Sequence, residues 1–243
     1  NDIFNNLCKI VMNVSNKIQS KAHLISKIGI FSSLAYLAIN NKYIRPIINQ
    51  KFSLKIKNGR HPVVENLISD NNQFIANDVS LNKHQFLSII TGPNMSGKST
   101  YLRQIGIIII MAQIGSFVPA DYAEIGIVDK LFTRVGASDN LSEGESTFLV
   151  EMQETANIIN NATKNSLILL DEIGRGTSTY DGLSIAWAVT EFIHNKIKAK
   201  TLFATHYHEL VDLANNLKSA NNLNILVEES SDKSDIVFLR KIV

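Results

Sequence analysis

The sequence predicts a mixed α/β fold in which a mostly parallel sheet is flanked by helices. Short apolar runs rich in β-branched residues alternate along the chain with longer segments of helical periodicity. A glycine-rich loop joins one of these runs to a helical segment, and a later run ends in two adjacent carboxylates. In parallel α/β folds, ligands bind at the carboxyl ends of the strands, so both features indicate one ligand site at that edge of the sheet.

The first forty residues differ from the rest of the chain. Apolar side chains recur every three or four positions over residues 3–38, and no proline occurs before Pro46. This pattern predicts one long helix or a broken pair, serving either as a core helix or as a lever to parts outside the chain. We therefore divide the chain into residues 1–50, the end of a lever or core helical domain, and residues 51–243, the α/β domain.

The α/β domain opens with a change of period. Residues 52–56 alternate apolar and polar side chains and are followed by Asn58-Gly59, which predicts a strand and turn in a small antiparallel sheet. Further predicted strands are 63–64, 74–75, 86–91, 128–135, 167–170, 201–205 and 237–239, and the predicted helices are 97–114, 147–161 and 182–196. Asp181 is the predicted N-cap of the last helix. The Asn- and Ser-rich segment around Asn221 and residues 230–231 predicts an exposed loop.

Composition limits the possible functions. The chain has 24 Lys+Arg and 22 Asp+Glu, so its net charge of +2 is too small to predict nucleic-acid binding by itself. Its single cysteine, Cys8, excludes an internal disulfide and a cysteine-built zinc site. The apolar stretch 105–118 is too short to cross a bilayer, and the first residues do not resemble a signal peptide. The chain begins at Asn1 without a methionine, and we interpret it as a piece of a longer protein.

The glycine-rich loop carries a complete phosphate-binding pattern. Residues 92–99 fit G-x-x-x-x-G-K-[ST] in full and lie between a predicted buried strand and a helix. Two glycines allow backbone N–H groups to turn inward, and the helix that follows directs its positive end at the same point. We expect Lys98 to reach the β- and γ-phosphate oxygens and the Ser99 hydroxyl to ligate Mg²⁺.

The second and third components are strand ends. The run 166–170 delivers Asp171 and Glu172 at its tip, and His206 follows the next strand along the chain. Asp171 would hold the metal directly or through water, and Glu172 would orient and polarise the attacking water. If the two strands are neighbours, His206 lies beside the γ-phosphate and stabilises charge there.

A further segment has two interpretations. Ser146 follows Gly144 and Glu145 and opens the helix predicted at residues 147–161. Ser146 is either a helix cap or an anion site, and an anion site would need a phosphate presented by a second copy of the domain.

Six motifs together resemble the ATPase domain of the MutS family of DNA mismatch-repair proteins. They are Thr-Gly-Pro-Asn-Met-Ser-Gly-Lys-Ser-Thr-Tyr (91–101), Gln-Ile-Gly-Ser-Phe-Val-Pro-Ala (113–120), Phe-Thr-Arg-Val-Gly-Ala-Ser-Asp (132–139), Ser-Thr-Phe-Leu-Val-Glu-Met (146–152), Leu-Leu-Asp-Glu-Ile-Gly-Arg-Gly-Thr-Ser-Thr-Tyr-Asp-Gly-Leu (169–183) and Phe-Ala-Thr-His-Tyr (203–207). The resemblance is dense from residue 55 to about residue 210, and residues 1–50 resemble the end of that family's lever helices.

The resemblance implies a P-loop ATPase of ABC type that binds Mg-ATP in composite sites of a dimer. By this analogy Phe74 stacks on adenine, Ser146 reaches the nucleotide of the opposite subunit, and Lys98, Glu172 and His206 are catalytic. The implied nucleotide-binding set is Phe74, Gly92, Pro93, Asn94, Met95, Ser96, Gly97, Lys98, Ser99, Thr100 and Ser146, and the metal set is Ser99 and Asp171. Glu145 is a departure, since many relatives carry a neutral or basic residue there.

The resemblance also predicts partners. They are a second MutS-type subunit, mismatched double-stranded DNA held by domains outside the chain, and downstream repair factors, with no membrane. The implied location is the cytoplasm or nucleoid of a bacterium, or otherwise an organelle or the nucleus. The chain stops before the family's C-terminal clamping region and lacks the mismatch-reading domain, so the fragment should not recognise a mismatch alone.

Other function classes stay open at this point. One is a non-hydrolysing, ATP-gated DNA clamp of a recombination-type relative, which the two carboxylates argue against. Another is a different ABC-type chromosome or transport ATPase, which the Ser-Thr-Phe opening at 146–148 disfavours. A purely structural dimerisation module would not require Lys98 or Glu172.

Overall fold

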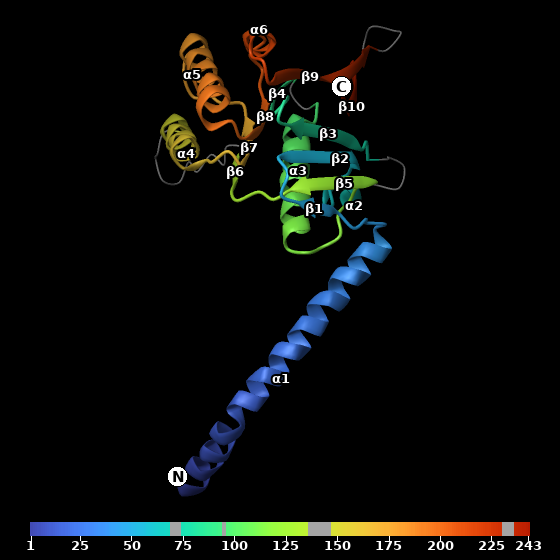
Figure 1. Cartoon of the computed structure of the whole chain (residues 1–243), viewed down its shortest axis with the longest axis vertical. Helices are drawn as coiled ribbons and strands as arrows, with labels where there is room; N and C mark the ends of the chain where they lie inside the picture. Colours follow the sequence, from blue (N-terminus) through green and yellow to red (C-terminus); the bar gives the residue numbers. More distant parts are fainter. Residues whose placement is uncertain (69–73, 94–95, 136–146, 230–235) are drawn as a thin grey trace. The chain divides into compact units, whose positions relative to one another are not determined.

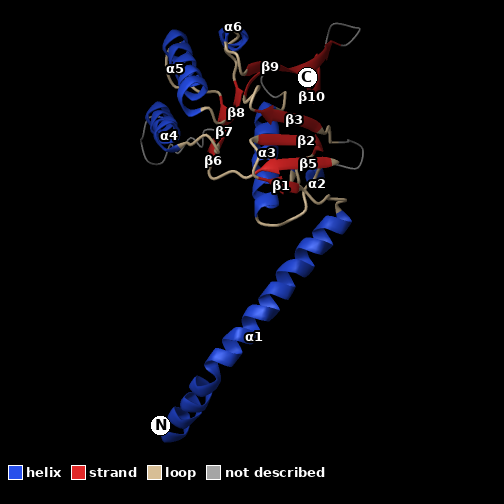
Figure 2. Ribbon diagram, viewed as in Figure 1, coloured by secondary structure: helices blue, strands red, loops and turns tan. Residues whose placement is uncertain are grey.

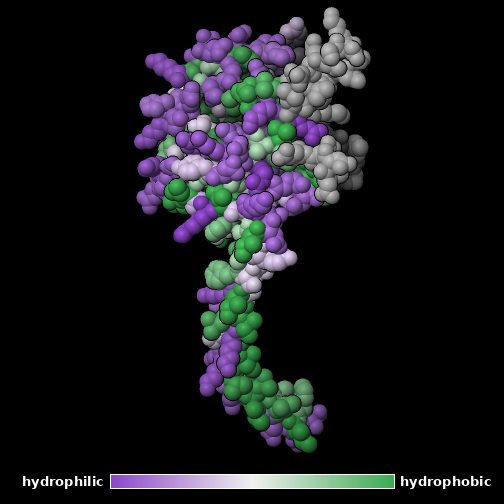
Figure 3. All heavy atoms as spheres, turned by 90° about the vertical axis from the view of Figure 1, so that its right-hand side faces the viewer, coloured by the Kyte–Doolittle hydropathy of each residue, from purple (hydrophilic) through white to green (hydrophobic). Residues whose placement is uncertain are grey.

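A computed structural model describes residues 1–68, 74–93, 96–135, 147–229 and 236–243, which form two compact units. The first unit, residues 1–43, is essentially one helix, α1 (Asp2–Asn40), which is unbroken over 39 residues. Ala38 is its one buried residue, and large apolar side chains such as Ile3 and Ile39 are exposed along it (Figure 3). Among the described residues, α1 is the one helix long and apolar enough to cross a membrane, although helices that pack against other helices share this composition.

The second unit, residues 44–243, contains a predominantly parallel sheet (Figure 1). Within the described residues its strands are β4 (Leu87–Thr91), β6 (Leu131–Arg134), β7 (Leu167–Asp171), β8 (Lys200–Ala204), β9 (Ala220–Glu229) and β10 (Ile236–Ile242). Their order is β10-β9-β4-β8-β7-β6, and every pairing is parallel except that of β10 with β9. The chain leaves β4 for the far edge and returns through β7 and β8, so the carboxyl ends of β4, β8 and β7 are neighbours.

The two faces of this sheet are covered by different layers (Figure 2). One face packs against α3 (Lys98–Gln113), and the other against α4 (Thr147–Asn161), α5 (Thr179–Phe192) and α6 (Glu209–Asn216). Successive side chains of β7 point to opposite faces of the sheet. Leu169 packs in the core on the α3 side, whereas Ile168 and Leu170 pack in the core on the side of α4, α5 and α6. Strands buried on both faces require the continuous apolar runs that the sequence shows.

A smaller sheet packs on the outer side of α3. Its described strands are β1 (Ile47–Asn49), β2 (Ser53–Gly59), β3 (Asn77–Asn82) and β5 (Tyr122–Gly126), in the order β1-β5-β2-β3. The pairings of β2 with β3 and β5 are antiparallel, and that of β1 with β5 is parallel. The Tyr101 hydroxyl on α3 donates to the backbone oxygen of Asp78 at 2.7 Å and ties the two layers together.

Several predictions from the sequence were wrong. Residues 63–64 belong to the start of a short helix, α2 (Val64–Leu67), and the strand expected at 74–75 begins only at Asn77. The N-cap of α5 is Ser178, whose side chain accepts from the backbone N–H of Asp181. Asn221 lies in β9 instead of an exposed loop. It is paired with Ser88 of β4, whose hydroxyl donates to the Asn221 side-chain oxygen at 2.7 Å. Residues 230–231 lie outside the described residues.

Candidate functional site

The glycine-rich loop lies at the carboxyl end of β4, directly before the N-terminus of α3. Gly97 has φ +106°, a backbone conformation that side chains disfavour, so the glycine allows the chain to turn into the helix here. The Ser96 hydroxyl donates to the carbonyl of Pro93 at 2.7 Å across the loop. Asn94 and Met95, two predicted nucleotide contacts, lie outside the described residues. The described part of the loop is therefore shaped by its own hydrogen bonds and by glycine.

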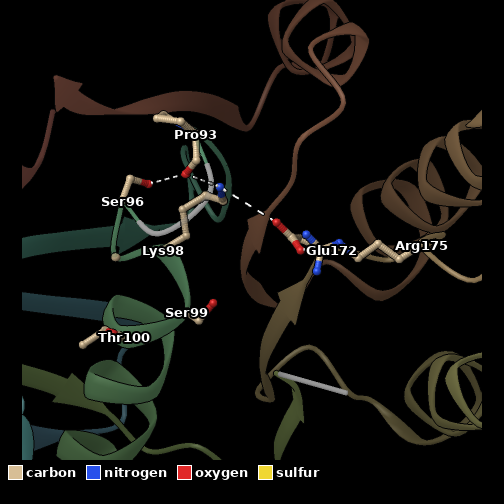
Figure 4. A pocket seen from close by; sticks show the side chains of 8 residues that line it. Pro93, Ser96, Lys98, Ser99, Thr100, Glu172 and Arg175 are labelled. Carbon is tan, nitrogen blue, oxygen red and sulfur yellow. Dashed lines mark hydrogen bonds and ion pairs between the residues drawn. The ribbon is translucent and has the colours of Figure 1, made fainter. Parts of the chain in front are cut away.

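Lys98, the first residue of α3, is 4% exposed and folds back over the loop. Its Nζ donates to the carbonyl oxygens of Gly92 at 2.5 Å and Pro93 at 3.0 Å. The same Nζ lies 3.9 Å from Oε1 of Glu172, and the two side chains point toward each other in Figure 4. Burial lowers the pKa of Lys98, although the carboxylates of Glu172 and Asp171 act in the opposite direction. A buried cation held by carbonyls can move to an anionic ligand with little loss of hydrogen bonding.

Asp171, the last residue of β7, is 9% exposed. Burial raises the pKa of its carboxyl group, while the hydroxyl of Ser99 lowers it. Its buried Oδ1 atom has no hydrogen-bond partner among the described residues. A buried carboxylate oxygen without a donor, beside a hydroxyl, fits a hard cation such as Mg²⁺. No group of three or more His, Cys, Asp or Glu in the described part of the chain could hold a metal, so the cation would need other oxygens.

Glu172 has an unusual backbone. Its φ is +55°, and a non-glycine residue in this left-handed region costs about 1–2 kcal/mol. Its backbone N–H donates to Ala204 of β8 at 2.8 Å, which holds it against the neighbouring strand. Its Oε2 pairs with Nε of Arg175 at 2.7 Å, and Arg175 stands beside it in Figure 4. Sequence reasoning did not assign Arg175 a role, although it lies three residues after Glu172 in the same motif.

His206 follows the carboxyl end of β8, whose neighbours are β4 and β7. Its ring lies 4.1 Å from that of Tyr207, measured between centroids. Burial lowers the pKa of His206, the charge of Glu172 raises it, and Arg175 and Lys98 lower it further. The three ionic groups thus act on this ring electrostatically, and the net shift favours the neutral imidazole.

The structure brings most of the predicted site together. A cavity of about 410 Å³ is lined by Glu172, Arg175 and a run that spans the loop and the start of α3: Pro93, Ser96, Gly97, Lys98, Ser99 and Thr100. His206 and Gly92 line a second cavity, which shares Pro93 with the first. Phe74 lines neither cavity, and Ser146 lies outside the described residues, as does Glu145.

Two buried side chains that contact the turn after β7, Glu151 and Tyr207, were not predicted from the sequence. Glu151 on α4 is 3% exposed and accepts a hydrogen bond from the backbone N–H of Gly174. The hydroxyl of Tyr207 donates to the carbonyl of the same Gly174 at 3.1 Å. Both contacts join residues far apart in sequence, so no local pattern could reveal them.

The fold and the site define an α/β domain whose polar residues gather at the carboxyl ends of neighbouring parallel strands, beside a phosphate-loop sequence. Within that class, the chain belongs to the MutS domain V family, whose family model matches residues 88–243.

Proteins described as DNA mismatch repair protein MutS align with the whole chain. Those of Lachnoclostridium phytofermentans and Caldanaerobacter subterraneus subsp. tengcongensis are each 57% identical, with 100% of this chain aligned to 26% and 27% of the relative. The protein of Flavobacterium psychrophilum is 54% identical, with 100% of this chain aligned to 28% of the relative. The chain therefore spans about a quarter of the length of these relatives.

Proposed function

We propose that this domain binds Mg-ATP at the carboxyl edge of its larger sheet and hydrolyses the terminal phosphate, as the ATPase domain of a mismatch-repair protein. One observation carries the proposal: Nζ of Lys98 in the phosphate loop lies 3.9 Å from Oε1 of Glu172, on the strand tip that also bears Asp171. A cation and a base then border one cavity, and the candidate metal-ligating carboxylate precedes the base in the chain, as phosphoryl transfer to water requires.

Binding is assigned to the loop and the start of α3. Backbone N–H groups of the loop residues 92–97, other than Pro93, would cradle the phosphates, and the N-terminal end of α3 would add its positive dipole. Lys98 would exchange its carbonyl partners, Gly92 and Pro93, for β- and γ-phosphate oxygens. Ser99 and Asp171 would hold Mg²⁺, which when bound supplies positive charge that neutralises the phosphates.

Chemistry is assigned to the strand tips of β7 and β8. Glu172 orients a water molecule and accepts its proton as the water oxygen bonds to the γ-phosphorus and the bond to ADP breaks. Oε2 of Glu172 is paired with Arg175 at 2.7 Å, which leaves Oε1, the oxygen that faces Lys98, to accept the proton. His206, neutral at rest, would donate to a γ-phosphate oxygen and stabilise the developing charge.

The larger assembly is a proposal on the same footing. An ABC-type arrangement would place two domains face to face, with Ser146 of each reaching the nucleotide of the other and Phe74 stacking on adenine. The first unit, residues 1–43, would act as the lever from the ATPase domain to DNA-holding domains. Mismatched DNA and downstream repair factors would engage those other domains, in the bacterial cytoplasm or nucleoid given that the relatives above are bacterial.

The test is Glu172→Gln, which keeps the size of the side chain and removes its basicity. General-base catalysis contributes typically 10²–10⁴-fold, so the single-turnover rate should fall by about 100-fold or more while ATP affinity stays within about twofold. Unchanged turnover would refute the role of Glu172.

The second candidate function is an ATP-gated DNA clamp that does not hydrolyse. The pair of Arg175 with Oε2 of Glu172 favours it, because this pair engages one of the two carboxylate oxygens. The same single-turnover measurement on the wild-type protein decides: bound ATP that is never converted to ADP would identify the clamp.

A further inference from the structure

The turn that carries Glu172 is held in a disfavoured backbone conformation. Glu172 at φ +55° is followed by the fully buried Ile173 and by Gly174 at φ +93°. A non-glycine residue stays in the left-handed region only when the surrounding structure fixes it. The contacts that fix this turn therefore determine where the Glu172 carboxylate points.

Both peptide groups of Gly174 are fixed by side chains from other elements. Its N–H donates to Oε1 of Glu151 on α4, and its carbonyl accepts from the Tyr207 hydroxyl, after β8, at 3.1 Å. There is no spare room on the remaining side: a Cβ on Gly174 would lie 2.6 Å from the Cα and carbonyl oxygen of Gly182. Fixing the two peptides after Ile173 leaves the turn little freedom to rotate Glu172 out of its conformation.

The second carboxylate oxygen of Glu151 is paired with an arginine. Its Oε2 lies 3.7 Å from Nη2 of Arg134, at the end of β6, and both side chains are at most 10% exposed. Nε of Arg134 also pairs with Oε2 of Glu154 at 3.0 Å. A buried carboxylate that is both paired and hydrogen-bonded keeps its charge and position, whereas removing one partner leaves an uncompensated buried charge. The carboxylate thus joins β6, α4 and the turn after β7.

We infer that Glu151 is a positioning residue for ATP hydrolysis: through Gly174 it holds the turn that aims Glu172 at the cavity. This inference rests on the proposed function, because it gives Glu172 a reaction to serve. Glu151 is not among the residues that line the cavity, so it sets the rate of the chemical step without changing nucleotide affinity.

The test compares Glu151→Gln and Tyr207→Phe with Glu154→Gln in the purified protein. Glu151→Gln cannot satisfy both Gly174 and Arg134, and Tyr207→Phe removes only the hydroxyl that holds the Gly174 carbonyl. Glu154→Gln is the matched control, since Glu154 pairs with the same arginine but its side chain is 48% exposed. The readouts are the dissociation constant for ATP and the single-turnover rate per bound ATP, with melting temperatures to report folding.

We expect both test variants to lose at least about fivefold in rate per bound ATP, with affinity within about twofold, and the control to match the wild type. A merely structural role lowers the folded fraction but not the rate per bound ATP, and that result overturns the inference. If Glu151→Gln does not fold, Tyr207→Phe gives the same two outcomes. A wild-type protein that neither binds nor hydrolyses ATP overturns the proposed function and the inference with it, whereas a wild-type rate retained by the variants overturns the inference alone.

Discussion

Nζ of Lys98 lies 3.9 Å from Oε1 of Glu172, across the gap between the start of α3 and the tip of β7. The lysine also donates to the carbonyls of its own loop, and Oε2 of Glu172 is paired with Arg175. We expect the lysine to give up these carbonyl partners when it binds ATP. A substitution of Lys98 should therefore change both the stability of the protein and its affinity for ATP.

Lys98→Met should raise the melting temperature of the nucleotide-free protein. The pKa of Lys98 is lowered, chiefly by burial, so folding disfavours the ammonium ion. Below the folded-state pKa both states carry the proton and the whole penalty is present; the penalty disappears as the pH rises towards the unfolded value. Each 1 kcal/mol recovered corresponds to about 2–4 °C in a protein of this size.

The same variant should not respond to ATP in the thermal assay. Saturating the wild type at about 100 times Kd adds about 2.7 kcal/mol, and this shift should be absent without the lysine. Lys200→Met is the matched control, because Lys200 is also buried and burial lowers its pKa. Lys200 begins β8, so it lies at the end of the strand opposite to the candidate site. An ATP shift of wild-type size in Lys98→Met would exclude Lys98 from binding.

His61 should make the protein less stable in mild acid. Its Nδ1 accepts from the backbone N–H groups of Val63 and Val64, each at 3.3 Å, and the residue is 6% exposed. Burial lowers the pKa of His61, so below its ordinary value of 6.5 the unfolded chain takes up the proton more readily. Stability is therefore lost as the pH falls through 6.5 towards the folded pKa, by at most about 1.4 kcal/mol per pH unit.

His61→Asn isolates this contribution. The asparagine oxygen can accept the same two N–H groups, as it does at helix N-termini, but does not titrate. Melting temperatures at pH 7.5 and 5.5 should therefore differ less in the variant than in the wild type. Equal differences would show that His61 is not the acid-sensitive group, and His206, whose pKa is also lowered, would be the next variant to measure.

The parts of the fold that the sequence predicted are those with a local signal. The strands ending at Thr91, Asp171 and Ala204 are continuous apolar runs, and their motifs follow directly, so their convergence could be expected from topology alone. The strand β9 was not predicted, because its asparagine residues are typical of an exposed loop. Asn221 and Asn224 instead accept hydrogen bonds from Ser88 and Thr91 on the neighbouring strand. Hydrogen-bonded side-chain pairs of this kind join segments that are far apart in the sequence, so they produce no periodic pattern from which a strand could be predicted.

Gly182→Ala tests the close packing behind Glu172. A Cβ at Gly182 would lie 2.2 Å from the Tyr207 hydroxyl oxygen and 2.3 Å from the carbonyl oxygen of Gly174, closer than real contacts allow. The backbone of the Glu172 turn must therefore shift, at a cost of typically about 1–3 kcal/mol for overpacking. We expect a melting temperature several degrees lower and a reduced hydrolysis rate per bound ATP.

Gly29→Ala provides the comparison for the alanine side chain itself. Nothing lies within 4 Å of a Cβ at Gly29, which is inside α1, so the change should stabilise that helix by about 1 kcal/mol through helix propensity. Opposite effects of the two substitutions, measured by thermal denaturation, would attribute the loss at Gly182 to its contacts. If Gly182→Ala melted and hydrolysed ATP like the wild type, the turn could yield without consequence, and close packing could not be what holds Glu172 in its left-handed conformation.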